Sequence, residues 1–226
     1  SRKTDESSAG KVGRQIMNES FRTILQEVSF EGKSLAHIWV ALHCIHTTAD
    51  FQLNDFIDLK NNVVPALYEK FHSGNPPVIV TDVSMVTRGI RKAIAQKLGL
   101  QIKCYLDDER VKTVAEEKGI TRSQAGIRLA VEEHPNAVFV FGNAPTALIE
   151  LVKLVRNKKA NPAGVIAAPV GFVNVQEIKW QLKYGCPDIP AVFVNGRRGG
   201  SNVAATIINA ILSWNEAKAM NPGEGL

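Results

Sequence analysis

AVFVFGNAPTALIELVKLVRNKKANPAGVIAA, residues 137–168, is the stretch that decides the fold. Two short apolar runs, Ala137–Phe141 and Gly164–Ala168, enclose a segment of different periodicity. Both runs carry apolar side chains on consecutive positions, which is typical of strands that are buried on both faces of a parallel sheet. The segment between them, Ala144–Arg156, turns its leucines and valines to one side at helical spacing. The stretch therefore predicts a strand, a helix and a parallel strand.

The same alternation extends outward on both sides. Three further apolar runs predict strands: Val78–Thr81, Ile102–Leu106 and Ala191–Val194. Val203–Trp214, after the last of them, again shows helical spacing. Strands that alternate with helices, joined by right-handed crossovers, predict a three-layer α/β/α sandwich. We expect a mostly parallel, five-stranded, Rossmann-like sheet with the strand order 3-2-1-4-5.

The residues before Val78 predict N-terminal helical segments that pack on the sandwich or on a partner subunit. They lie near Lys11–Ser29, Ser34–His46 and Lys60–His72. With no linker or repeat in view, we expect a single domain over residues 1–226, with frayed ends at about 1–10 and 216–226.

Composition and charge exclude several classes of protein. Hydrophobic residues make up 45% and charged residues 22%, as in ordinary globular chains. No apolar run approaches the ~18 residues that span a bilayer, and the N-terminus lacks the apolar core of a secretory signal, so we expect a cytoplasmic protein without a membrane partner. The net charge of +5, with no long Lys/Arg run, suits an acidic small molecule and gives no nucleic-acid stripe. The three cysteines form no CxxC pair and predict neither a disulfide framework nor a metal site.

Small, glycine-rich and polar residues follow the expected strands, at the sheet edge where open α/β folds bind ligands. They are Thr81-Asp82, Gly142-Asn143-Ala144-Pro145-Thr146, Pro169-Val170-Gly171 and Asn195-Gly196-Arg197-Arg198-Gly199-Gly200-Ser201. In the last group Ser201 is a candidate N-cap, glycines let backbone amides approach a ligand, and the two arginines can grip a carboxylate or phosphate. An anion site and a surface turn with solvated arginines both fit this spacing.

The loop after residue 141 leaves a similar choice. Asn143 can cap a helix and Pro145 suits its first turn, so the loop fits a ligand site and equally a well-capped helix. Neither glycine loop is a GxGxxG or P-loop motif. A nucleotide-dependent Rossmann enzyme therefore lacks support from a motif.

The histidines offer a candidate acid. His43 and His46 are three residues apart and can share one helix face, and Thr47, Thr48 and Asp50 follow. Histidine is the usual acid–base group at neutral pH, although a lone histidine is more often structural. A metal would need a third ligand, and none stands at a suitable spacing. The acidic run 107–109 predicts a solvated loop.

These segments together resemble the precorrin-8X methylmutase family, also called precorrin isomerase, including its cobalt-precorrin-8 members. Each match is modest alone, but their order is specific and they cover almost the whole chain. The matching segments are Glu19-Ser20-Phe21, Ile45–Phe51 (IHTTADF), Thr81–Val86 (TDVSMV), Thr121-Arg122-Ser123, Gly142–Leu148 (GNAPTAL), Pro169–Val173 (PVGFV) and Gly196–Ser201 (GRRGGS).

The resemblance implies an isomerase of cobalamin biosynthesis. Such an enzyme moves a methyl group from C11 to C12 of precorrin-8X or cobalt-precorrin-8 by an acid-assisted 1,5-sigmatropic shift, and forms hydrogenobyrinate or cobyrinate. It implies that His46 is the catalytic residue, which protonates or hydrogen-bonds a ring nitrogen. It also implies a homodimer with a shared active site, a polycarboxylate corrinoid as the small-molecule partner, and no cofactor, since cobalt would enter only as part of the substrate. The expected substrate-binding residues are Ser20, His43, Thr81, Asp82, Met85, Arg122, Asn143, Thr146, Gly171, Arg197, Gly199, Gly200 and Ser201.

Two departures from the family pattern affect the site. Relatives often carry an arginine at position 43, so a cation there requires a protonated His43. After Pro169–Val173, Glu177 and Lys179 remain but Ile178 replaces a small residue, and we leave that helix out of the expected site. A non-catalytic corrinoid-binding carrier is the alternative function.

Overall fold

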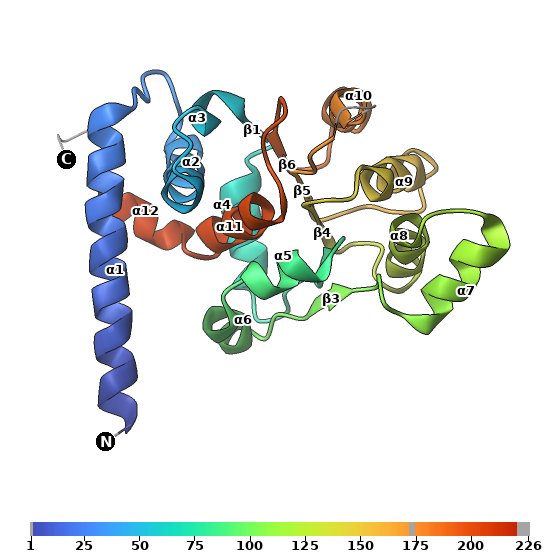
Figure 1. Cartoon of the computed structure of the whole chain (residues 1–226), viewed down its shortest axis with the longest axis horizontal. Helices are drawn as coiled ribbons and strands as arrows, with labels where there is room; N and C mark the ends of the chain where they lie inside the picture. The colour runs from blue at the N-terminus through green and yellow to red at the C-terminus, as the bar shows by residue number, and fades with distance from the viewer. Residues whose placement is uncertain (1, 172–174, 221–226) are drawn as a thin grey trace.

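The computed structural model describes residues 2–171 and 175–220, with side chains from residue 10 onward. A six-stranded sheet in the order β1-β6-β5-β4-β2-β3 lies between two groups of helices (Figure 1). Its strands are β1 (Ile57–Lys60), β2 (Ile79–Thr81), β3 (Ile102–Cys104), β4 (Val138–Phe141), β5 (Gly164–Ala167) and β6 (Ala191–Val194). All neighbouring strands are parallel except β1, which pairs antiparallel with β6.

The helices divide between the two faces of the sheet. One side carries α1 (Arg2–Glu27), α2 (Leu35–Thr48), α3 (Leu53–Phe56), α4 (Val63–Phe71), α5 (Ser84–Gly89), α6 (Lys92–Leu98), α11 (Ser201–Leu212) and α12 (Trp214–Met220). The other side carries α7 (Glu109–Lys118), α8 (Arg122–Glu133), α9 (Pro145–Arg156), α10 (Val175–Trp180) and a π-helical turn, η1 (Gln181–Gly185). This is the three-layer α/β/α arrangement that the sequence predicts.

Strand β4 shows why its sequence is apolar throughout. Val138 and Val140 belong to the core beneath α11, whereas Phe139 and Phe141 belong to the core beneath α8 and α9. Because side chains alternate between the faces of a strand and both faces are covered here, every position must be apolar. The four side chains are accordingly all fully buried.

The expected strand order is wrong, and so is the expected number of strands. β4 pairs with β2, with Ile79 opposite Val138, and β3 takes the edge, so the five expected strands run in the order 2-1-3-4-5. The physical reason lies in composition, because β3 (IKC) is only half-buried and carries Lys103 in its middle. A charged residue suits an edge strand, and the wholly apolar β4 suits the interior.

The sixth strand, β1, falls in a region where we expected only helices. Its residues, IDLK, alternate between apolar and polar, which is typical of a strand with one buried face. α4 then begins at Val63, later than expected. Asn61 and Asn62 make the turn that separates this strand from α4, with φ of +55° and +54°, a conformation that asparagine tolerates.

Both ends of the described chain are helical where we expected fraying. α1 already begins at Arg2, and its N-terminal half stands away from the body of the molecule (Figure 1). α12 continues to Met220 and buries Ala217 in the core beneath α11. Residues 1 and 221–226 of the expected frayed ends lie outside the described residues.

Candidate functional site

The strand order reverses between β2 and β4, because the chain leaves β2 for β3 on one side and later adds β4 on the other. The loops after two such strands diverge, and open sheets bind ligands there. A buried carboxylate occupies this point. Asp82 accepts hydrogen bonds from the backbone N–H groups of Gly142 at 3.0 Å, Asn143 at 2.8 Å and Ala144 at 2.7 Å. Asp82 therefore supplies the anion that these amides bind, and it fixes the loop that leads into α9.

This arrangement corrects two details of the expected capping. Ala144 is the N-cap of α9, and the Asp82 carboxylate does the work that we assigned to Asn143, which is exposed. Gly200 is the N-cap of α11, and Ser201 is the first residue of the helix. Pro145 takes the predicted first-turn position.

The glycine-rich turn before α11 lies against the ends of β4 and β5. The Gly200 N–H donates to the carbonyl of Ala168 at 2.8 Å, and a Cβ on Gly199 would collide with the same oxygen. Gly199 and Gly200 have φ of +132° and +105°, a backbone conformation that residues other than glycine rarely adopt. A Cβ on Gly142 would lie 2.6 Å from Cα of Ser201. Close backbone approach therefore explains these glycines, and it brings the start of α11 to the sheet edge.

His46 lies in the last turn of α2 and is exposed. Its Nδ1 is 2.7 Å from the hydroxyl oxygen of Ser20 on α1, and its ring meets the ring of Phe21 edge-on at 5.9 Å. A hydrogen bond at one ring nitrogen together with an aromatic contact fixes the orientation of the imidazole. The expected residues Ser20 and His46 are therefore in direct contact.

Two contacts connect the His46 segment to the glycine turn. Arg198 Nε lies 2.7 Å from Oδ2 of Asp50, and its guanidinium stacks 4.6 Å from the centre of the Phe56 ring. The hydroxyl of Thr206 on α11 donates to the hydroxyl of Thr47, the neighbour of His46, at 3.3 Å. The end of α2 and the start of α11 are therefore tied on the same side of the sheet.

His43 is buried one turn before His46. It packs between the rings of Trp39, at 4.5 Å, and Phe21, at 4.9 Å, and its Nδ1 is 2.8 Å from the Trp39 carbonyl. Burial lowers the pKa of His43 to about 4, against the weaker opposing effect of that hydrogen bond. His43 is therefore neutral at pH 7, and it does not supply a cation at this position.

A narrow crevice joins three further expected residues. It measures about 10 Å³, is close to the size of one water molecule, and is lined by Thr81, Asp82 and Arg122. The hydroxyl of Thr81 is buried and bonds to that of Thr87 at 2.7 Å. Arg122, exposed at the start of α8, is the lining residue that is open to solvent.

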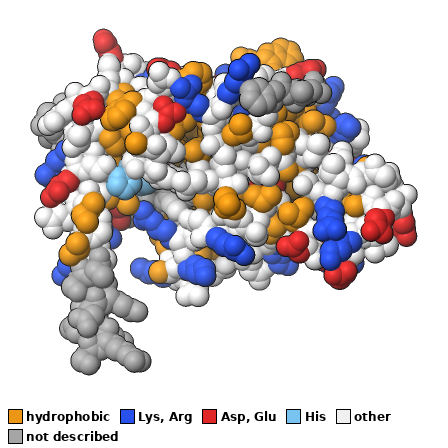
Figure 2. All heavy atoms as spheres, in the orientation of Figure 1, with side chains coloured by type: hydrophobic (Ala, Val, Ile, Leu, Met, Phe, Trp, Pro, Cys, Tyr) orange, Lys and Arg blue, Asp and Glu red, His pale blue; other side chains and the backbone are white. Residues whose placement is uncertain are grey.

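The remaining expected residues lie around this edge. Thr146 contacts Thr121, the residue that caps α8, at 3.3 Å, so it joins the starts of α9 and α8. Gly171 lies against Pro145, and Met85 on α5 is 66% exposed. Arg197 is exposed, and Phe172 and Val173 of the PVGFV segment lie outside the described residues. Figure 2 shows apolar side chains across the middle of the face that carries α5 and α11 in Figure 1, with Lys and Arg side chains around them.

The residues that sequence reasoning missed act by holding loops. Asp50 pairs with Arg198, which is not among the expected substrate-binding residues. Lys179 is buried and donates to carbonyls of two loops, although we left its helix out. For Asp50 a signal was available, since it ends the HTTAD segment, but its partner lies 148 residues away.

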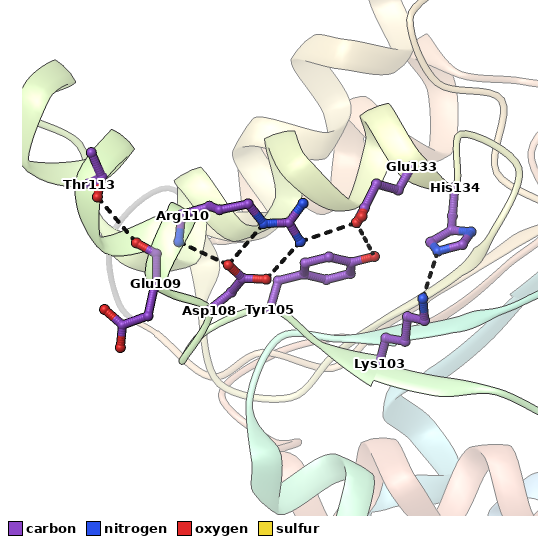
Figure 3. Close-up of polar contacts among 8 residues, drawn as sticks. All are labelled: Lys103, Tyr105, Asp108, Glu109, Arg110, Thr113, Glu133 and His134. Carbon is purple, nitrogen blue, oxygen red and sulfur yellow. Dashed lines mark hydrogen bonds and ion pairs between the residues drawn. The ribbon is translucent and has the colours of Figure 1, made fainter.

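The acidic run at residues 107–109 organises a network that fastens α7 to α8 (Figure 3). Asp108 caps α7 by accepting from the N–H of Arg110 and pairs with its guanidinium at 2.8 Å, and Arg110 also reaches Glu133 at 3.4 Å. Tyr105 donates to the same Glu133 carboxylate, and burial with that nearby charge raises the pKa of Tyr105 to about 12. The run is therefore structural here. Within the described side chains, no three His, Cys, Asp or Glu residues gather closely enough to hold a metal ion.

A second hollow of about 850 Å³ opens at the opposite edge of the sheet, before β2, β4 and β5 begin. Residues such as Pro77, Pro135 and Pro162 line it, and none of the expected site residues does. In the described part of the chain, no helix is long and apolar enough to cross a membrane.

Comparisons with known proteins agree on one family. The family model described as precorrin-8X methylmutase matches residues 15–214. The chain is 41% identical to the cobalt-precorrin-8 methylmutase of Salmonella typhimurium over 177 residues, which cover 78% of this chain and 80% of that protein. It is 31% identical to the precorrin-8X methylmutase of Pseudomonas aeruginosa over 204 residues, which cover 90% and 97%. The crystal structure of precorrin-8x methyl mutase from Thermus thermophilus is similar with a TM-score of 0.79 at 32% identity, over 94% of this chain and 98% of that one.

Proposed function

Because the chain belongs to the precorrin-8X methylmutase family, whose members are isomerases, we propose that it moves a methyl group from C11 to C12 of cobalt-precorrin-8 and so forms cobyrinate in cobalamin biosynthesis. Several relatives that are 32–41% identical carry the name cobalt-precorrin-8 methylmutase, which favours the cobalt-containing substrate over metal-free precorrin-8X. The cobalt is part of the substrate, and the isomerisation needs no methyl donor and no cofactor.

One observation carries the proposal. The His46 imidazole is exposed, oriented by Ser20 and tied through Asp50 and Arg198 to the glycine-rich turn. Since Nδ1 faces the serine hydroxyl, Nε2 is the ring atom that can meet a substrate nitrogen. A hydrogen bond or proton given there withdraws electron density from the conjugated ring.

The isomerisation then balances within the substrate. The bond between C11 and the methyl carbon breaks, the bond between C12 and that carbon forms, and the ring double bonds shift between them. General acid assistance of this kind contributes ~10²–10⁴ in rate. The proton that His46 lends returns to the imidazole when the product leaves, so the residue ends the cycle in the protonation state in which it began.

The surrounding residues would bind and orient the macrocycle. Arg122 and Arg197 are exposed cations at this edge, and guanidinium groups bind carboxylates with two hydrogen bonds. Met85 gives an apolar contact for the flat ring. We assign further contacts to the groups around the loops and the glycine turn, namely Ser20, Asn143, Thr146, Gly171, Gly199, Gly200 and Ser201.

Three expected contact residues are better placed to support the site. Asp82 is saturated by backbone amides, Thr81 is bonded to Thr87, and His43 lies beneath the Phe21 ring. We propose that they act on the substrate through the groups they hold.

We also propose a homodimer in which the partner subunit completes the site. The crevice at the carboxyl edge is far too small for a corrinoid, so a second surface is needed to enclose the ring. On α1, Val12 and Ile16 are one turn apart and 56% and 59% exposed. The double variant Val12→Glu/Ile16→Glu tests this. Light scattering should show a monomer, and an assay should show no activity.

The decisive experiment offers cobalt-precorrin-8 and precorrin-8X separately to the purified full chain and follows the absorption spectrum. Conversion of the cobalt compound at the higher kcat/KM supports the proposal. Tight binding of cobyrinate without conversion of either compound would overturn it in favour of a corrinoid carrier.

A further inference from the structure

Lys179 is a buried amine at the carboxyl ends of β5 and β6. It lies on α10 with 2% of its surface exposed. Its Nζ donates to the carbonyl of Pro169 at 3.3 Å and to the carbonyl of Val194. Among the described side chains, no carboxylate forms an ion pair with it. Burying an ammonium without a counter-charge costs free energy, so the role of a lysine that contacts only two carbonyls needs an explanation.

Those two carbonyls begin the two loops that carry much of the proposed site. Pro169 precedes Gly171, and Val194 precedes the turn that holds Arg197, Gly199 and Gly200. A second residue of α10, Gln176, donates to the carbonyl of Gly196 in the same turn. α10 therefore holds both loops from behind, on the side away from His46 and α2.

We propose that Lys179 is a positioning residue, whose ammonium sets the separation of residues 169–171 from the turn at 195–200 and so the affinity for the substrate's carboxylates. The inference rests on the proposed methylmutase function. An ammonium can donate to both carbonyls at once with a charge-assisted bond, which an apolar side chain of the same length cannot do.

The charge of Lys179 adds a signature that packing alone would not give. Burial lowers its pKa to about 8, so the ammonium is lost as pH rises through that value. The strands against it, GVIA and AVFV, carry no charged residue. On its own helix Glu177 is exposed and accepts from Gln181, and Lys153 of α9 lines the groove beside Glu177. In the turn at 195–200, the charged residues are Arg197 and Arg198.

The test compares the full-length wild type with Lys179→Met, Lys179→Gln and the control Lys183→Met. Lys183 is on the adjoining turn η1 but pairs with Asp58 at the surface, so its loss should leave kinetics unchanged. We expect Lys179→Met to raise KM for cobalt-precorrin-8 about tenfold with kcat within about twofold. The wild-type KM should rise between pH 7 and 9, and this rise should be missing in both Lys179 variants. Hydrogen exchange of the 195–200 amides without ligand should be faster in Lys179→Met than in the control.

Several outcomes would overturn the inference. The inference fails if Lys179→Met has the same KM and the same exchange rate as the wild type. It also fails if the rise in KM with pH persists in Lys179→Gln. If Lys179→Met does not fold, Lys179→Gln decides, because it keeps an uncharged N–H donor on a side chain that is one bond shorter. If the wild type converts neither corrinoid, the proposed function fails, whereas the exchange measurement needs no ligand and still decides whether Lys179 positions the loop.

Discussion

Arg198 and Asp50, 148 residues apart in sequence, form an ion pair in which Nε of the guanidinium lies 2.7 Å from Oδ2 of the carboxylate. Asp50 follows the helix that carries His46, and Arg198 precedes the glycines that open α11. The pair therefore sets the candidate acid relative to the loops that we propose to bind the substrate.

Replacing Arg198 with Gln should impair catalysis far more than stability. Both partners are about one-third exposed, so the pair contributes only ~0.2–1 kcal/mol to the free energy of unfolding. A misplaced acid, in contrast, can cost up to ~100-fold in rate. We expect a 10–100-fold (order-of-magnitude) loss of kcat/KM with a melting temperature near that of the wild type. Arg156→Gln, at the end of α9, is the control, and equal activity losses in the two variants would disprove the role of the pair.

Replacing His46 with Ala should remove turnover and leave the fold intact. The side chain is exposed, so its loss leaves no cavity, whereas the lost acid should lower kcat by ~10²–10⁴. Circular dichroism and single-turnover kinetics give the two readouts. His72→Ala removes another exposed histidine, directly after the end of α4, and should keep full activity. A near-wild-type rate in His46→Ala would assign the acid to another group.

Replacing Asp82 with Asn should destabilise the protein. The carboxylate accepts three backbone N–H groups, and an amide puts its own NH₂ against at least one of them. Each buried donor left unsatisfied costs about 1–3 kcal/mol, so urea unfolding should show a loss of about 2–4 kcal/mol. If Asp82 contacts the substrate instead, the variant will keep its stability and raise only KM.

Five strands were predictable because each is a run of mostly apolar residues, which favours burial. The order of these strands in the sheet was not predictable. Five apolar runs became β2 to β6 with ends shifted by at most two residues. Their neighbours depend on which strand tolerates an edge, and Lys103 in β3 was the one local signal for that. β1 pairs with a strand more than 130 residues later, and such a pairing leaves no trace in a four-residue segment.

The candidate site, too, was predictable from the sequence only in part. Motifs pointed to His46 and Ser20, which the structure brings into contact, and to the glycine turns. They did not show that Asp82 already binds the amides of the next loop, because a carboxylate at a switch point fits a ligand contact and an internal cap equally well. Burial decides between the two roles, and burial depends on the whole fold.

Acidification should weaken the protein through His43. Burial holds its folded-state pKa at about 4, below the value of 6.5 expected in the unfolded chain, so between these values the unfolded state binds more protons. The free energy of unfolding should therefore fall as pH drops from 6.5 to 4, by a few kcal/mol at most. Burial also lowers the pKa of His37, which contributes in the same direction. Urea unfolding at several pH values should show that the free energy of unfolding depends less steeply on pH in His43→Gln than in the wild type. An unchanged pH dependence would mean that His43 is charged in the folded protein.

Gly142→Ala should show that close backbone approach, rather than flexibility, builds this edge of the sheet. A Cβ at position 142 would lie 2.6 Å from Cα of Ser201 and 2.8 Å from the Val86 side chain, so the start of α11 must move. Overpacking of this kind costs about 1–3 kcal/mol, and the displaced turn should lower kcat/KM as well. Gly126→Ala is the matched control, because a Cβ there would meet Tyr105 at an ordinary 3.5 Å within α8, where alanine favours the helix by about 0.5–1 kcal/mol. Thermal unfolding of the two variants should therefore shift in opposite directions, and a Gly142→Ala protein as stable as the wild type would show that α11 can withdraw from β4 at no cost.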